Sequence, residues 1–270
     1  MTRPSEEAPT PAPGSMRVLL AENDAVSRKV AQLMLERLGH RVDIVLNGLE
    51  ASLAVQREHY DVVMMDDRMP EIDGRHAVQV IRSARPLGGQ PVIVAVGNGE
   101  WRREATDGQG GVDLVLAKPF RLGQLSTMLE RAADRGSAAA HGTRAVPEVV
   151  DGEGAIRARL ADMAGPDPAE DREIFSDILR SLARRAPADV DCLSEAVRLS
   201  AHGEVEDRAH SLRGAVLTLG GASLGRHLEE VESRGRAREA VPEALMLLVR
   251  AEQARFGIDL LAVADALDRV

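Results

Sequence analysis

The sequence has 270 residues, of which 44% are hydrophobic and 2% aromatic, which suffices for two domains with aliphatic cores. The formal net charge of −9, with no basic run, argues against a nucleic-acid partner. A single cysteine, Cys192, excludes an internal disulfide and fits a reducing, cytoplasmic setting. No apolar run approaches the roughly 18 residues that a membrane-spanning helix needs, so we expect no membrane partner.

The first half of the chain has the pattern of an α/β protein. Residues 1–15 are rich in Pro, Glu, Ser and Thr and are predicted to be a disordered leader. Residues 16–134 then alternate short apolar runs with amphipathic helical patterns. This alternation predicts a doubly wound, five-stranded parallel sheet. The expected strands are Val18–Ala21, Arg41–Val45, Val62–Met65, Val92–Val96 and Leu114–Leu116.

The second half has no strand-like run. Residues 135–149 are rich in Ala, Gly and Ser and are predicted to be a linker. Residues 150–270 carry long amphipathic stretches, which predict an all-α bundle. The expected helices are Ala155–Ala164, Ala169–Arg185, Val205–Leu219, Ala222–Arg234 and Pro242–Leu267.

Polar side chains follow three of the predicted strands, at the point where each strand ends. Glu22 and Asn23 follow the first strand, Asp66 and Asp67 the third, and Lys118 the fifth. Ligands of open α/β sheets bind outside the carboxyl ends of the strands, so we expect these side chains to converge. Carboxylates with open positions suit Mg²⁺, an ammonium can offset the charge of a phosphoryl group, and a carboxylate can itself form an acyl phosphate.

Three segments resemble the response-regulator receiver domain of two-component systems, whose fold is flavodoxin-like. They are residues 22–30 (ENDAVSRKV), 65–74 (MDDRMPEIDG) and 118–120 (KPF), and the resemblance covers nearly all of residues 16–134. It implies that Asp66 is the phosphoacceptor and that Lys118 contacts the acyl phosphate. It also implies a Mg²⁺ site formed by Glu22, Asn23, Asp66 and the backbone carbonyl of Arg68. Lys118 is one of only two lysines among 34 Lys and Arg residues, which favours a specific role.

The sequence departs from the receiver pattern at several positions. Asn23 replaces the usual second acid, so Mg²⁺ affinity should fall unless Asp24 compensates. Val96 stands where the family has Thr or Ser, and Val115 stands where it has the switch aromatic. The predicted fourth helix contains three glycines within residues 107–111, which are costly in a helix. We expect an altered output face, a solvated Asp67, and a surface or helix-packing role for Trp101.

One histidine in the second half lies in a distinctive helical context. At roughly 100° per residue, Ala209, Leu212, Ala215, Val216 and Leu219 form a core stripe, and His210 points away from it to solvent. Gly214 lies one turn further on the same face and would let another protein approach the imidazole. Arg213 flanks this face and could contact phosphoryl oxygens, and Leu217 could be an apolar docking contact.

Residues 209–220 (AHSLRGAVLTLG) resemble the signature of histidine phosphotransfer (HPt) domains, with Arg213 in place of the usual Lys. Leu228-Glu229 in the next helix also fits, and the resemblance covers roughly 150–270. It implies that His210 is the phosphohistidine, with Arg213 and Gly214 beside it. The other histidines lack comparable context and are interpreted as structural or solvated.

The two resemblances together imply a phosphorelay protein that passes phosphoryl groups between Asp66 and His210. Its partners would be a sensor or hybrid histidine kinase and a downstream response-regulator receiver. We find no ATP-binding segment and therefore expect a protein that is not an enzyme. Such a chain could be free-standing or the tail of a hybrid kinase, with the first favoured.

Two other functions compete with the relay. In one, the receiver is a non-phosphorylated docking module beside a working HPt domain. In the other, the chain is a Mg²⁺-dependent phosphohydrolase that uses Asp66. Phosphohydrolases of that type commonly place a second Asp two residues after the nucleophile, and Arg68 stands there instead.

Overall fold

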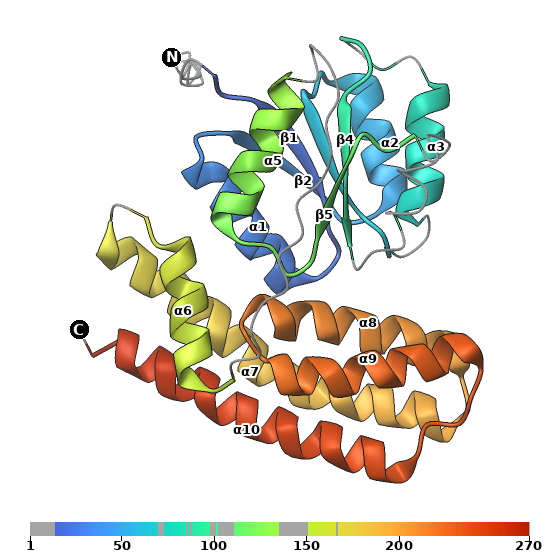
Figure 1. The fold of residues 1–270 in the computed structure, drawn as a ribbon, viewed down its shortest axis with the longest axis vertical. Helices are drawn as coiled ribbons and strands as arrows, with labels where there is room; N and C mark the ends of the chain where they lie inside the picture. The colour runs from blue at the N-terminus through green and yellow to red at the C-terminus, as the bar shows by residue number, and fades with distance from the viewer. Residues whose placement is uncertain are drawn as a thin grey trace, which may run out of the picture.

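The computed structural model describes residues 14–69, 73–84, 86, 88–97, 101, 111–134, 151–165 and 167–269. They form an α/β half, residues 14–134, and a helical half, residues 151–269, which pack against each other (Figure 1). The predicted leader and linker fall almost entirely outside the described residues, as do residues 107–110 of the predicted fourth helix. Among the described helices, none combines the length and apolar character needed to cross a bilayer.

The α/β half is built on a five-stranded parallel sheet with the order β2-β1-β3-β4-β5. Each predicted strand is present within one residue of its predicted ends. The strands are β1 (Arg17–Ala21), β2 (Arg41–Val45), β3 (Val62–Asp66), β4 (Val92–Gly97) and β5 (Leu114–Ala117). The central strand β3 is buried throughout, as expected for a strand covered on both faces. Its last residue, Asp66, pairs in register with Val96 of β4.

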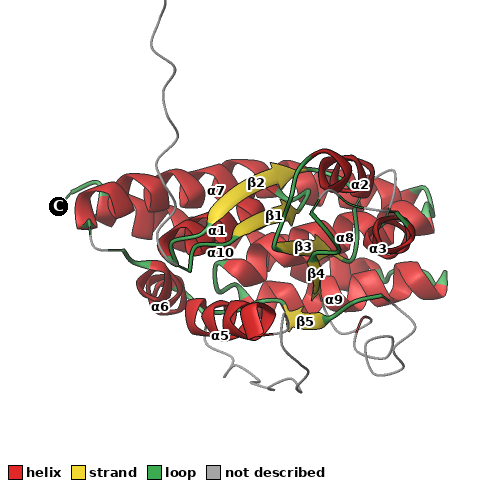
Figure 2. Ribbon diagram, turned by 90° about the horizontal axis from the view of Figure 1, so that it is seen from above, coloured by secondary structure: helices red, strands yellow, loops and turns green. Residues whose placement is uncertain are grey.

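Helices cover both faces of this sheet (Figure 2). Helices α1 (Ala25–Arg37) and α5 (Leu122–Asp134) cover one face, and α2 (Gly48–Arg57) and α3 (Gly74–Ser83) the other. Aspartate or asparagine side chains cap three of these helices, at Asp24, Asn47 and Asp73. Trp101 is fully buried in the core beneath α2 and α3, so of the two expected roles it has the helix-packing one and not the surface one.

The helical half contains α6 (Glu153–Met163), α7 (Pro168–Arg198), α8 (His202–Thr218), α9 (Ala222–Ala237) and α10 (Glu243–Leu267). Helix α8 packs against α9, and α7 packs against α10, which is consistent with a helical bundle. The predicted end of the second of these helices at Arg185 is wrong, because α7 continues through Pro187 to Arg198. Pro187 is exposed, while Ala186, Val190 and Leu193 extend the buried stripe past it.

The two halves share one hydrophobic core. Helix α1 of the α/β half packs against α6, α7 and α8 of the helical half. The buried apolar side chains of α1 and α5, together with Val18 and Leu20 of β1, belong to the same cluster as those of α7 to α10. The contact surface lies at the end of the sheet where β1 and β3 finish, so it brings the helical half over the polar residues that follow those strands (Figure 1).

Candidate functional site

Three of the predicted polar residues meet at the carboxyl edge of the sheet. Lys118 Nζ lies 2.5 Å from Glu22 Oε2 and 2.8 Å from Asp66 Oδ1. Glu22 Oε1 also accepts a hydrogen bond from the backbone N–H of Asp24 at 2.9 Å. All three side chains are buried, so the ammonium is held between two carboxylates out of contact with bulk water.

The buried charges in this cluster do not balance, and the pKa values reflect this. Burial raises the pKa of Asp66 well above its ordinary value, and the neighbouring Glu22 raises it further, although Lys118 opposes both effects. Burial lowers the pKa of Lys118, but Asp66 and Glu22 raise it by more, so the lysine stays protonated. One ammonium thus faces two carboxylates and cannot neutralise both.

Asp24 does not supply the charge that Asn23 lacks. One of its oxygens, Oδ1, caps α1 by accepting from the N–H groups of Val26 and Ser27 at 3.1 and 2.9 Å. The other, Oδ2, accepts from Arg185 of α7 at 2.6 Å. Both oxygens thus have partners outside the cluster of Lys118, Glu22 and Asp66, although Asp24 itself lies in the wall of the cavity between the halves.

His210 is buried, with 7% of its surface exposed, and the prediction that it points to solvent is wrong. Its helix α8 does turn this face away from the bundle core, but the α/β half covers it. His210 Nε2 lies 3.5 Å from Asp67 Oδ1. Asp67 is therefore not solvated as expected, because its carboxylate is enclosed between the two halves.

Gly214 faces helix α1, as a residue that permits a close approach would. A Cβ atom at Gly214 would meet Ser27 Oγ at 3.8 Å, and no other atom within 4 Å. Leu217, in contrast, packs over Gly225 of α9 and is partly exposed. Its expected role as a docking contact for another protein stays a prediction.

A second carboxylate, Glu232 of α9, lies on the other side of the imidazole. Its Oε1 is 3.1 Å from His210 Nδ1. Burial lowers the pKa of His210, but the contacts with Asp67 and Glu232 raise it by more, so the net change is upward. Burial raises the pKa of Asp67 and His210 lowers it by more, to about 2. The imidazole thus lies between two carboxylates, which favour its protonated form and raise its pKa.

Glu232 was missed at the sequence level, although the sequence carries a signal for it. It follows Leu228 by four residues and therefore lies on the apolar stripe of α9, where a charged side chain needs a partner. Its partners include Arg213, whose Nε lies 3.0 Å from Glu232 Oε2. Arg213 is itself buried and also meets Glu229 at 3.2 Å. These ion pairs fix Arg213 against α9, and its expected contact with phosphoryl oxygens stays a prediction.

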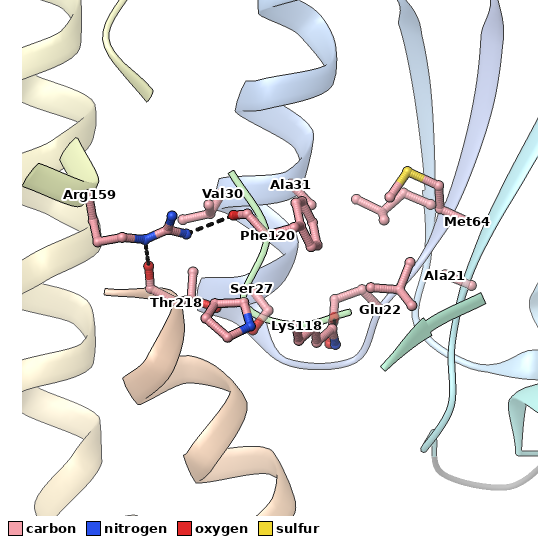
Figure 3. Close-up of a pocket in the computed structure, with 13 residues that line it drawn as sticks. Ala21, Glu22, Ser27, Val30, Ala31, Met64, Lys118, Phe120, Arg159 and Thr218 are labelled. Atoms are coloured by element: carbon pink, nitrogen blue, oxygen red, sulfur yellow. Dashed lines mark hydrogen bonds and ion pairs between the residues drawn. The ribbon is translucent and has the colours of Figure 1, made fainter. Parts of the chain in front are cut away.

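Charged contacts cross between the halves around this histidine. Arg68 donates to Glu206 of α8 at 2.5 Å and forms a second ion pair with Glu232. Arg37 of α1 forms an ion pair with Asp171 of α7. Figure 3 shows a further crossing, where Arg159 of α6 donates to the carbonyl oxygens of Phe120, at 2.9 Å, and Thr218, at 3.1 Å. The loop that carries Lys118 is thereby fixed against the helical half.

These elements enclose a cavity of about 160 Å³ between the halves. One ligand atom from each of Asp66, Asp67 and His210 lies within 4.8 Å of the other two. The wall includes carboxylate, amide and backbone oxygens that suit Mg²⁺, so the residues present fit this ion. The residues that line the cavity include Glu22, Asn23, Asp66, Arg68, Lys118 and His210.

Val96, which stands where the family has Thr or Ser, and Val115, which stands where it has the switch aromatic, both lie on strands of the sheet. Val96 is buried beside Asp66 in the sheet and has no hydroxyl that could bond a phosphoryl oxygen. Val115 of β5 is only partly buried and packs at the margin of the core beneath α2 and α3. Neither side chain offers a polar contact to the cavity.

A family model described as "Response regulator receiver domain" matches residues 18–130. Among solved structures, the chain is 33% identical to the receiver domain of sensor histidine kinase PA1611 from Pseudomonas aeruginosa PAO1, which has a magnesium ion in its active site cleft. That comparison covers 43% of this chain and 96% of the other, with a TM-score of 0.39.

Curated relatives differ in how much of the chain they match. Sensor histidine kinase GacS of Pseudomonas protegens is 28% identical over 232 residues, which is 79% of this chain and 23% of that protein. Probable histidine kinase 1 of Oryza sativa subsp. indica is 47% identical over 79 residues, which is 29% of this chain and 8% of that protein. The chain thus spans less than a quarter of the length of either relative.

These relatives contradict the prediction that the chain is not an enzyme. The relatives that match most of the chain are sensor histidine kinases, which are enzymes. The prediction was drawn from missing ATP-binding segments, and such segments can lie in the three quarters or more of each relative that this chain does not cover.

Proposed function

Because residues 18–130 are a response regulator receiver domain of the two-component type, we propose that this chain transfers phosphoryl groups between Asp66 and His210 within one molecule. In this proposal, residues 16–134 are the receiver and residues 150–270 are an HPt domain, joined by a linker at 135–149 after a leader at 1–15. The match to GacS over 79% of the chain supports a second domain of hybrid-kinase type, since it extends beyond the receiver.

One observation carries the proposal. A carboxylate oxygen of Asp66 and a ring nitrogen of His210 lie within 4.8 Å of each other in a shared cavity. Reacting atoms in a near-attack arrangement are about 3–3.5 Å apart. A phosphorus atom bonded to Asp66 would project toward the imidazole, so the separation leaves room for a phosphoryl group between the two residues.

The transfer needs no reactant besides Asp66 and His210. The neutral imidazole of His210 attacks the phosphorus of an acyl phosphate on Asp66, the N–P bond forms, and the bond from phosphorus to the Asp66 oxygen breaks. The electron pair of that bond returns to the carboxylate, and the reverse step regenerates the acyl phosphate. Glu232 accepts from Nδ1–H of His210, which leaves Nε2 as the attacking atom. Lys118 would contact the phosphoryl oxygens.

Glu22, Asn23, Asp66 and the backbone carbonyl of Arg68 would hold Mg²⁺. When bound, this ion offsets the negative charge of the phosphoryl oxygens during transfer. The partners would be a histidine kinase that supplies phosphoryl groups and a receiver that accepts them.

A second candidate function is favoured by Asn23, Val96 and Val115. Each lacks a group that phosphorylated receivers use, so the receiver could act as a non-phosphorylated docking module that covers His210.

The chemical stability of the phosphorylated residue distinguishes the two functions. Purified chain is incubated with Mg²⁺ and a ³²P-labelled small acyl phosphate, which phosphorylates carboxylates of receivers. If the chain is a relay, the wild type should carry label on His210 that is stable to alkali and labile to acid. Asp66→Ala should carry no label on His210. His210→Gln should carry only alkali-labile label, as expected for an acyl phosphate. His202→Gln, on the same helix, is the matched control. Histidine label in Asp66→Ala equal to the wild type would overturn the relay.

A further inference from the structure

We propose that Asp66, Asp67 and His210 form a binding site for a divalent transition-metal ion of the Zn²⁺ class, shared between the two halves of the chain. The three side chains are buried and come from two elements, the end of β3 and the middle of α8. Two carboxylates and one imidazole form a ligand set that Zn²⁺ accepts. This site shares Asp66 with the predicted Mg²⁺ site, which consists of oxygen ligands from the receiver alone, but it differs by including Asp67 and the imidazole of His210.

The distance between Asp67 and His210 fits metal coordination better than a hydrogen bond. Charge-assisted N–H···O contacts are about 2.7–2.9 Å long, whereas Asp67 Oδ1 and His210 Nε2 are 3.5 Å apart. Two ligands at about 2.0–2.2 Å from a tetrahedral ion are roughly 3.3–3.6 Å apart. The two atoms therefore already have the separation that a bridging ion requires, and the Asp66 oxygen lies within 4.8 Å of both.

The Asp67 oxygen that lies nearest His210 Nε2 lacks a hydrogen bond. Asp67 Oδ1 has no hydrogen-bond partner among the described residues, although the side chain is 7% exposed. A buried carboxylate oxygen without a donor is costly unless a cation or a hydrogen bond compensates. Nearby, the single ammonium of Lys118 is shared between the carboxylates of Glu22 and Asp66. A divalent ion would supply the positive charge that these buried carboxylates lack.

Glu232 provides the support that a metal-binding histidine usually has. Histidines that ligate metals commonly donate their second ring N–H to a carboxylate, which sets the tautomer and the ring orientation. His210 Nδ1 lies 3.1 Å from Glu232 Oε1, so Nε2 is the atom presented to Asp67. Asp66 and His210 line the cavity between the halves, so a water molecule that serves as the fourth ligand could enter from that side.

The imidazole determines which ions the site prefers. Nitrogen ligands favour Zn²⁺ and similar ions, whereas Mg²⁺ prefers oxygen ligands and retains several waters. Because the site needs residues from both halves, an ion bound there would hold the halves together. It would also occupy the phosphoacceptor oxygen and the nucleophilic nitrogen, so it would block transfer.

The test is Zn²⁺ binding to the full chain, measured by competition with a chromophoric chelator and without any phosphoryl donor. A chain that fails to bind Zn²⁺ could therefore still transfer phosphoryl groups as proposed. The wild type should bind one Zn²⁺, and both Asp67→Asn and His210→Gln should weaken binding at least about tenfold. The matched controls Asp61→Asn and His202→Gln should bind as the wild type does. Mg²⁺ binding should be the same in His210→Gln and in the wild type.

A second readout separates loss of a ligand from loss of the fold. Zn²⁺ should raise the thermal unfolding midpoint of the wild type and of both controls, because it binds only the folded chain. It should not do so in Asp67→Asn or His210→Gln, whose metal-free midpoints show whether they are folded. Equal Zn²⁺ affinity in folded His210→Gln and the wild type would overturn the proposal, since the receiver's acidic residues alone would then be the site.

Discussion

His210 is held between Asp67 and Glu232, and this position links its charge to the stability of the fold. Its pKa in the folded chain is raised above the ordinary value of 6.5. A group whose folded pKa is raised stabilises the fold fully below its unfolded pKa, and this contribution disappears as the pH rises through the folded pKa. Conversely, the contribution of Asp67, whose folded pKa is about 2, is lost only as the pH falls from 3.8 toward 2.

We therefore expect the imidazole to stabilise the chain more at pH 6 than at pH 9. The difference in free energy of unfolding between the wild type and His210→Gln, measured by urea denaturation, should be larger at pH 6. Taking the difference between variants removes titrating groups that the two proteins share. A difference that is the same at both pH values would mean that the imidazole is not a cation in the folded chain.

The neutral side chain of Asn23 is expected to weaken Mg²⁺ binding. Asn23→Asp adds a carboxylate to the proposed Mg²⁺ ligands, whereas the oxygens of Asp24 already cap α1 and bind Arg185. Mg²⁺ affinity, measured by calorimetry, should rise about tenfold or more, which corresponds to about 1.4 kcal/mol. Asn47→Asp, at the start of α2, is the control and should leave Mg²⁺ affinity unchanged. Unaltered affinity in Asn23→Asp would show that Asn23 is not a ligand.

The sequence predicted part of this site for a simple reason. Glu22, Asp66 and Lys118 follow strands of one parallel sheet, so their convergence depends only on the sheet. The enclosure of His210 by Asp67 and Glu232 depends on which faces of the two halves meet. No periodicity within either half determines that choice.

At the scale of elements, β4 and β5 lack the side chains that carry the usual receiver response. Val96 has no hydroxyl to bond a phosphoryl oxygen, and Val115 has no ring to relocate. A ligand can shift a conformational equilibrium only through contacts that differ between the two states. Phosphorylation of Asp66 should therefore change the receiver only slightly.

Amide hydrogen exchange of the full chain, with and without beryllofluoride and Mg²⁺, tests this expectation. We expect little change in protection across β4 and β5 at confirmed occupancy. Val96→Thr restores the hydroxyl and should increase the change. Large protection changes across β4 and β5 in the wild type would contradict the role assigned to Val96.

Element boundaries were predicted well for strands and less well for helices. Each strand is a short apolar run bounded by polar residues, so its ends are marked in the sequence. Helix α7 was predicted too short because Pro187 usually breaks a helix. It continues because Pro187 is exposed and the apolar stripe on its buried face is uninterrupted.

At the scale of the molecule, the two halves form one closed unit in which Asp66 and His210 are both covered. Ion pairs at the edge of the shared core hold this arrangement, among them Arg37 with Asp171. Removing one partner of a largely buried pair costs about 3–5 kcal/mol. Arg37→Ala should therefore open the molecule.

Small-angle scattering provides the measurement. The radius of gyration of Arg37→Ala should exceed that of the wild type, because separated halves occupy a longer envelope. Arg180→Ala is the control, since its partners Asp265 and Asp268 lie within the helical half. An identical radius for Arg37→Ala and the wild type would mean that the shared apolar core alone keeps the halves together.

The most direct test of the account is whether transfer between Asp66 and His210 occurs within one chain. Wild type and an equimolar mixture of Asp66→Ala and His210→Gln are incubated with the same labelled acyl phosphate over a hundredfold range of dilution. We predict that histidine label in the wild type forms at a rate per chain that does not depend on dilution, while the mixture acquires histidine label much more slowly and in proportion to concentration. Equal rates in the mixture and the wild type would contradict it.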